Sequence, residues 1–200
     1  MKRFVTWGAM TLALALLAVV PASSQDKKAE GQPLDLEAYL KLAEPGPQHK
    51  LLEPLVGTWT YKAKLWMDPS KPPTESTGTC ERKWILGNRY LEEHIKGDEK
   101  DRPFAGRGLI GYDNGQKKYV TAWVDNMGSG IMTSTGTADS TGKVFTYHSE
   151  SFDPVMKKMV KGRDVLTIES ADRHRMEAYR VLPDGKEMKV LELTVTRAKK

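Results

Sequence analysis

The chain has 200 residues, a formal net charge of +5 and a single cysteine, Cys80. This length is sufficient for one domain with a substantial core, and a single cysteine excludes an intramolecular disulfide. The Lys and Arg residues are interspersed with Asp and Glu, as on a solvated surface, so no nucleic-acid partner is expected.

The first residues, 1–24, have the pattern of a secretory signal peptide. Lys2 and Arg3 precede an uncharged apolar run over residues 4–20, and small residues follow through Ser24. Signal peptidase requires this order of a basic start, an apolar centre and a small-residue exit. The pattern predicts a periplasmic or secreted mature protein without stable membrane insertion. The alternative is an uncleaved anchor, because the run approaches the minimum length of a membrane span.

Short helices are expected after a polar lead-in. Residues 25–33 are polar and predict a flexible segment. Asp35 is suited to cap a first helix within residues 34–55, and the Pro-Gly-Pro sequence at 45–47 ends that helix. Leucines at helical spacing in residues 48–55 predict a second helical turn.

From residue 56 to residue 200 the hydrophobic period changes from about 3.6 to 2, which indicates β-strands. Segments rich in Thr, Val, Tyr, Phe and Trp alternate with turn signals, and their number predicts about ten strands. Short turns require antiparallel neighbours, so the strands form a meander. The turn signals are Asp68-Pro69, Gly87-Asn88, Gly97-Asp98, Asn114-Gly115, Gly128-Ser129-Gly130, Ser140-Thr141-Gly142, Asp153-Pro154, Ala171-Asp172 and Asp184-Gly185.

The clearest hairpin lies in the stretch from Pro103 to Met132. Its turn is expected at residues 113–116, because Asn-Gly between alternating hydrophobic runs strongly favours a tight hairpin. In the strand that follows, alternate residues including Trp123 share one face. Both faces are largely apolar, so this strand is expected inside a covered sheet.

A meander of this size leaves two free edges unless the first strand pairs with the last. Leu191, Leu193 and Val195 form an apolar face on the last strand, and Arg197 has the same parity. Antiparallel pairing of these two strands would bring Arg197 over Trp59 as a cation–π contact. The prediction is a closed barrel, and a splayed sandwich is the alternative.

These features resemble the calycin superfamily of lipocalins, fatty-acid-binding proteins and nitrobindins. In that superfamily a Gly-x-Trp sequence opens the barrel and a late arginine packs over the tryptophan. Here those residues are Gly57, Trp59 and Arg197. The motifs HKLLEPLVGTW, ILGNRYLEE, PFAGRGLIGYDNGQKKYVTAWVD and MGSGIMTSTG more specifically resemble the bacterial family of unknown function DUF1579. The resemblance implies a calycin-like barrel over the mature chain beyond about Gln48, and no established activity.

A barrel of this kind can be filled by side chains or can hold one small ligand. Trp84, Tyr90 and Trp123 are candidates for the walls of an apolar cavity, and ordinary core packing is the alternative. Arg107 and His148 are polar residues on otherwise apolar faces, so they are candidates for binding a polar head group. The alternative is that both point into solvent.

Catalytic and cofactor patterns are absent from the sequence. The four histidines show no HxxxH or HxH spacing, so no metal site is expected. In the nitrobindin branch of the superfamily that this chain resembles, a histidine near the C-terminus binds haem. The corresponding sequence here is ELTVTR, which has no histidine, and His174 is the nearest one. No cofactor is therefore expected. An enzyme that uses His148 with Glu150 or Arg107 is a minor alternative.

The sequence therefore predicts an exported, non-catalytic, all-β barrel that binds a small, largely apolar molecule in its interior. The alternative is a solid-cored structural or protein-interaction module that acts through its surface loops, such as residues 96–102 and 125–130. Neither the oligomeric state nor the identity of the ligand follows from the sequence.

Overall fold

The computed structural model describes residues 35–153, 156–182 and 184–199. The expected signal peptide at 1–24 and the lead-in at 25–33 lie outside the described residues.

Two short helices and a 3₁₀ turn precede the sheet: α1 (Leu36–Ala43), α2 (Pro47–Lys50) and η1 (Glu53–Leu55). The expected cap of α1 is confirmed, since Asp35 Oδ1 accepts a hydrogen bond from the backbone N–H of Ala38 at 3.0 Å. No residue of α1 is buried, so its apolar stripe lies in solvent. Neither described helix is long and apolar enough to cross a membrane.

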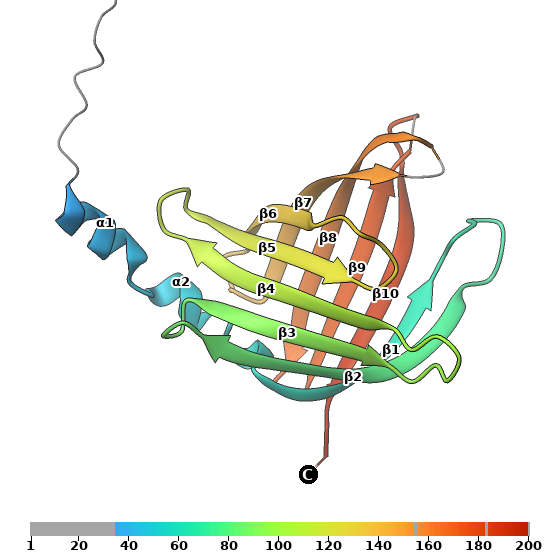
Figure 1. Cartoon of the computed structure of the whole chain (residues 1–200), viewed down its shortest axis with the longest axis horizontal. Helices are drawn as coiled ribbons and strands as arrows, with labels where there is room; N and C mark the ends of the chain where they lie inside the picture. The colour runs from blue at the N-terminus through green and yellow to red at the C-terminus, as the bar shows by residue number, and fades with distance from the viewer. Residues whose placement is uncertain (1–34, 154–155, 183, 200) are drawn as a thin grey trace, which may run out of the picture. The chain divides into compact units, whose positions relative to one another are not determined.

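Ten antiparallel strands follow, each paired with the next along the chain (Figure 1). β1 also pairs with β10, so the sheet closes, and the expected barrel of about ten strands is confirmed. The strands are β1 (Gly57–Leu65), β2 (Thr74–Ile85), β3 (Tyr90–Gly97), β4 (Ala105–Asp113), β5 (Lys118–Asp125), β6 (Met132–Ala138), β7 (Val144–Asp153), β8 (Lys158–Ser170), β9 (Arg173–Val181) and β10 (Glu187–Arg197).

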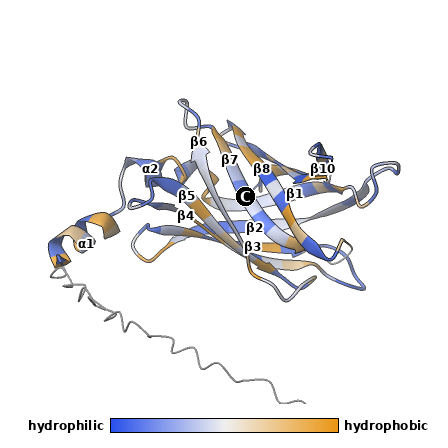
Figure 2. Cartoon of the chain, turned by 90° about the horizontal axis from the view of Figure 1, so that it is seen from above, coloured by the Kyte–Doolittle hydropathy of each residue, from blue (hydrophilic) through white to orange (hydrophobic). Residues whose placement is uncertain are grey.

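The strands alternate between a buried and an exposed side, which reflects their period-2 sequences. In β1, Trp59, Tyr61 and Ala63 are buried, and Thr60 and Lys62 between them are exposed. The alternating colours along the strands in Figure 2 show the same pattern in hydropathy. One side of each strand therefore supplies the interior, and the other faces water.

The expected contact between Trp59 and Arg197 closes the barrel. The two residues are register partners across β1 and β10, and the Arg197 guanidinium carbon lies 4.0 Å from the centroid of the indole ring. Arg197 also donates hydrogen bonds to the carbonyl oxygens of Val56 at 3.2 Å and Ala171 at 2.7 Å. Gly57 has φ +133°, and a Cβ there would lie 2.5 Å from Arg197 Nη1, so only glycine fits beneath the guanidinium.

The hairpin between β4 and β5 is present, but its turn differs from the expected one. The loop has four residues, 114–117, and its left-handed residue is Lys117, with φ 55°. Asp113 Oδ1 accepts hydrogen bonds from the backbone N–H groups of Gly115 and Gln116. The aspartate therefore organises a longer turn than the Asn-Gly pair alone predicts.

The N-terminal segment fills one end of the barrel, which we call the closed end. Leu52 and Leu55 are fully buried there and pack against inward residues of the sheet. These inward residues are Leu91, Ile110, Tyr119, Phe145, Tyr147, Leu166 and Ile168. We call the N-terminal segment at residues 47–55 the plug. Trp59 Nε1 donates a hydrogen bond to the Leu55 carbonyl at 3.0 Å, so the plug is joined to the first strand.

Replacement of Arg197 by alanine tests the closure. It removes the cation–π contact and leaves carbonyl oxygens without their donor, so the free energy of unfolding is expected to fall by about 2–4 kcal/mol. Urea denaturation measures this change. Arg173→Ala is the control, because this exposed arginine pairs with Glu169 and is expected to contribute less than about 1 kcal/mol. Equally small losses for both variants would contradict a central role for Arg197.

Candidate functional site

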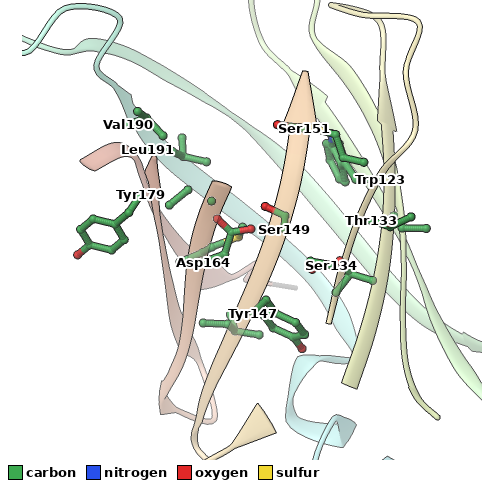
Figure 3. Close-up of a pocket in the computed structure, with 18 of the residues that line it drawn as sticks. Trp123, Thr133, Ser134, Tyr147, Ser149, Ser151, Asp164, Tyr179, Val190 and Leu191 are labelled. Atoms are coloured by element: carbon green, nitrogen blue, oxygen red, sulfur yellow. Dashed lines mark hydrogen bonds between the residues drawn. The ribbon is translucent and has the colours of Figure 1, made fainter. Parts of the chain in front are cut away.

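The other end of the barrel contains a cavity of about 390 Å³, at what we call the mouth. Its rim includes the loops at 66–73, 98–104 and 126–131. The lining combines strand residues from most of the barrel (Figure 3). The lining residues are Leu65, Glu93, Gly108, Leu109, Ile110, Thr121, Ala122, Trp123, Met132, Thr133, Ser134, Tyr147, Ser149, Ser151, Val160, Lys161, Gly162, Asp164, Leu166, Met176, Ala178, Tyr179, Arg180, Val190 and Leu191.

Two glycines on β4 explain why Trp123 leaves this space open. A Cβ at Gly106 would lie 2.3 Å from Trp123 Cζ2, and one at Gly108 would lie 3.2 Å from Trp123 Cε3. The indole therefore lies against the backbone of β4, which places it along the wall. Trp123 Nε1 donates to Asp125 Oδ2 at 2.8 Å, which fixes the orientation of the ring.

Hydroxyl groups line part of the cavity on β5, β6 and β7. The hydroxyls of Thr121 and Ser134 are hydrogen-bonded to each other at 2.6 Å. Ser149 and Ser151 follow on β7 and are turned inward by the same alternation. Gly162 makes room for Ser149, because a Cβ at that glycine would lie 2.7 Å from Ser149 Oγ.

A buried ion pair lies beneath the cavity. Arg82 Nη2 is 2.5 Å from Glu93 Oε1, and Cys80 Sγ lies 3.4 Å from the same oxygen. Burial lowers the pKa of Arg82, but the adjacent Glu93 carboxylate outweighs it, and the net pKa is raised. Burial raises the pKa of the Cys80 thiol, so it stays protonated at neutral pH. Tyr147 also lines the cavity, and its hydroxyl is directed away from Ser149 and Asp164 (Figure 3).

Asp164 on β8 presents a carboxylate to the cavity. It is the register partner of inward-facing Tyr147 and Ala178, and Figure 3 shows it on the same side of the wall as Ser149. Among the described residues, no side chain or backbone group makes a hydrogen bond or ion pair with this carboxylate. Burial raises the pKa of Asp164 to about 6, although Arg163 and His148 oppose the shift.

The mouth also contains an ion pair. Arg180 lines the cavity, and its Nη1 lies 2.5 Å from Oδ2 of Asp153, whose side chain is buried. Lys161 also belongs to the lining. It precedes Gly162, the register partner of Arg180 on β8, and its side chain is exposed. The positive charge of Arg180 is thus balanced within the protein.

The structure brings one of the five expected ligand-binding residues into the cavity, Trp123. Trp84 is half-buried at the closed end, where its Nε1 donates to Glu53 Oε2 at 2.6 Å. Tyr90 lies on the outer face over Gly111, because a Cβ at that glycine would be 2.6 Å from the tyrosine ring.

For Arg107 and His148 the structure supports the solvent-exposed alternative. The Arg107 side chain is 67% exposed, and its Nη1 lies 3.2 Å from Nε2 of His94 on the outside of the barrel. His148 is exposed and borders a second, more open depression together with Glu150 and Arg163. The inward side of β4 carries glycines in place of Arg107, because Trp123 occupies that space.

Asp164, Ser149 and the pair of Arg82 and Glu93 were not among the residues predicted from the sequence to bind a ligand. A signal for the pair is present, since each is a single charge between apolar residues two positions away, as in Leu91-x-Glu93. The same pattern marks Asp164 on β8. A charged residue in this pattern is expected to point inward. It is then either held in an ion pair or available to bind a ligand, because burial of an isolated charge costs folding free energy.

The metal and haem expectations concern different parts of the fold. Within residues 35–153, 156–182 and 184–199, no three His, Cys, Asp or Glu side chains are close enough to form a metal site. His174 is fully buried, with its ring centroid 4.3 Å from that of Trp59 and outside the cavity lining. Burial and the nearby Arg82 and Arg197 lower the pKa of His174 to about 4, so the ring is neutral.

Comparison with known proteins gives a family and a fold. Residues 44–197 match a family model described as "Protein of unknown function (DUF1579)". Among curated proteins, none matches this chain.

Two solved structures share the barrel. Rv2717c from M. tuberculosis has a TM-score of 0.57 and 15% sequence identity, covering 78% of this chain and 100% of that chain. The S-type phycobiliprotein lyase CPES from Guillardia theta has a TM-score of 0.55 and 11% identity, covering 76% and 92%. At these identities the likeness establishes the fold alone.

Replacement of Gly106 by valine tests how the cavity is kept open. The new side chain would displace the Trp123 indole from β4 toward the interior, so binding of the apolar fluorescent probe N-phenyl-1-naphthylamine is expected to weaken several-fold. Gly111→Val is the matched control, because it displaces Tyr90 on the outer face. Unchanged probe binding in Gly106→Val, or equal weakening in both variants, would contradict this account of the wall.

Replacement of Asp164 by asparagine tests the buried carboxyl. The folded-state pKa of about 6 lies above the usual aspartate pKa of 3.8, so ionisation opposes folding above pH 6 and this cost disappears near pH 4. At pH 8 the variant is expected to be about 1–3 kcal/mol more stable than the wild type, with no difference near pH 4. Urea denaturation at both pH values measures this. Glu150→Gln, on the exposed side of β7, should change stability little at either pH, and a pH-independent effect of Asp164→Asn would contradict the assignment.

Proposed function

The chain belongs to the DUF1579 family of proteins of unknown function, and on that premise we propose that it is a non-catalytic barrel that binds one small, largely apolar molecule in its interior. The observation that carries the proposal is the cavity of about 390 Å³ behind the mouth. This volume falls within the range of about 300–1,000 Å³ typical of small-molecule sites. It also exceeds the space of a few waters, at about 30 Å³ each.

The lining supports an apolar ligand. Leu65, Ile110, Met176 and Leu191 contribute hydrophobic side chains from widely separated strands, and Trp123 adds an aromatic wall. Burial of the apolar body of a ligand against these groups provides the main driving force for binding. The polar groups of the cavity, among them Ser149 and Asp164, would fix the orientation of a ligand.

The reactive groups near the cavity favour binding over chemistry. Glu93 is engaged by Arg82, and the raised pKa of Cys80 keeps the thiol protonated and poorly nucleophilic. His174 is enclosed beside Trp59 and does not reach the cavity lining. One fold neighbour is a phycobiliprotein lyase, but its 11% identity transfers no activity to this chain.

The proposal includes export, which rests on the sequence of residues 1–24. A periplasmic or secreted barrel of this kind would take its ligand from outside the cytoplasm or from a membrane surface.

One observation favours the alternative of an interaction module that acts through its loops. Met67, Met127 and Ile131 are 81%, 75% and 72% exposed on loops that surround the mouth. Exposed apolar side chains at one end of a domain are typical of contact surfaces. The cavity, however, argues against a solid core.

Native mass spectrometry of protein purified after its own export tests the proposal. A bound mass of one small molecule is expected on the wild type, together with a polypeptide mass that begins at Gln25. Ala178→Phe, which adds an aromatic ring on the inward face of β9, should yield bare protein. Repeated recovery of bare wild-type protein would contradict ligand binding, and a retained N-terminus would contradict cleavage.

A further inference from the structure

We propose that the ligand is an amphipathic amine, with an apolar body in the cavity and a protonated nitrogen bound by Asp164 and Ser149. This inference rests on the proposed function and names the chemistry of the molecule. It depends on the position of one carboxylate and on the balance of charges around it.

The first observation is the position of Asp164. Its register partners on both sides, Tyr147 on β7 and Ala178 on β9, line the same cavity, so the carboxylate is directed inward. The described residues offer it no hydrogen bond or ion pair. A carboxylate in an apolar cavity without a partner is costly to the fold. A ligand that supplies the missing donor recovers this cost on binding.

The second observation concerns the other charged residues of the lining: two of them are held in ion pairs, and a third, Lys161, is exposed. Glu93 is paired with Arg82 at 2.5 Å beneath the cavity, and Arg180 is paired with Asp153 at 2.5 Å at the mouth. Lys161 on β8, next to the register partner of Arg180, has an exposed side chain. Among the described lining residues whose side chains point inward, the charged group without an ion pair is the Asp164 carboxylate, which is negative.

The third observation is the hydroxyl next to this carboxylate. Ser149 is a diagonal neighbour of Asp164 across β7 and β8, and both point into the same space (Figure 3). The Thr121 and Ser134 hydroxyls are bonded to each other, but no described group is bonded to the hydroxyl of Ser149. An ammonium group has three N–H donors and no acceptor, so it can donate to the carboxylate and to the hydroxyl oxygen together.

The same geometry selects against acidic ligands. A fatty acid with its carboxylate near Asp164 would place two negative charges together in a site of low dielectric. A neutral alcohol could donate only one hydrogen bond and would gain no charge attraction. The order of affinity expected for ligands with the same apolar body is therefore amine, then alcohol, then carboxylate.

Three probes of equal chain length test this order: n-octylamine, n-octanol and octanoate, each titrated calorimetrically into the mature protein at pH 7.5. The wild type is expected to bind octylamine about tenfold more tightly than octanol. Asp164→Asn should weaken octylamine about tenfold and change octanol less than about threefold. Glu150→Gln removes one negative charge from the exposed face of β7 and should leave both affinities unchanged.

A cavity-filling variant separates this inference from the proposed function. Ala178→Phe should weaken octylamine and octanol alike, and Ala178→Leu replaces it if the larger side chain prevents folding. If Asp164→Asn has no effect on octylamine while the filled variant loses both probes, the amine inference is overturned and cavity binding stands. If the filled variants bind both probes as the wild type does, or if the wild type binds neither probe, the proposed function fails as well.

Discussion

The fold depends on one contact between the two ends of the meander, the stacking of Arg197 on Trp59. A ten-stranded sheet has two free edges, and pairing of β1 with β10 removes both. The guanidinium is the point where this pairing, the N-terminal plug and the β8–β9 turn meet, since Arg197 donates to Val56 and to Ala171. The pairing of β1 with β10 and the packing of the N-terminal segment into the closed end are therefore structurally linked. Both use the same half-buried cation, and Gly57 leaves the space that this cation needs.

The interior is divided into a filled half and an open half, and the division follows from side-chain volume. Leu52 and Leu55 enter from the N-terminal segment and complete the core at the closed end. Toward the mouth, glycines stand opposite large aromatic rings, so the rings lie flat and the centre stays open. Gly106 beneath Trp123 is the clearest case. An open interior in a closed barrel is then able to expose a small number of polar groups, among them Asp164.

Much of the fold could be predicted from the sequence, because turn signals and period-2 alternation are local properties. The barrel, the number of strands and the contact between Trp59 and Arg197 were all predicted in this way, and each is confirmed. The candidate site was predicted less well. Alternation shows which residues share a face, but the side that faces inward depends on packing across the barrel. Arg107 and His148 therefore lie outside, and Asp164, which alternation places beside apolar residues, lies inside.

The connection between the start and the end of the chain has a consequence for biosynthesis. Val56 and Arg197 are 141 residues apart in sequence, yet they share a hydrogen bond in the finished barrel. A ribosome releases β10 last, so β1 remains an unpaired edge during nearly the whole of translation. Long-range pairing of this kind slows folding, and an exposed edge invites intermolecular pairing. A chain that crosses a membrane unfolded before it folds would avoid this delay on the ribosome, and it would instead need protection of β1 during transit.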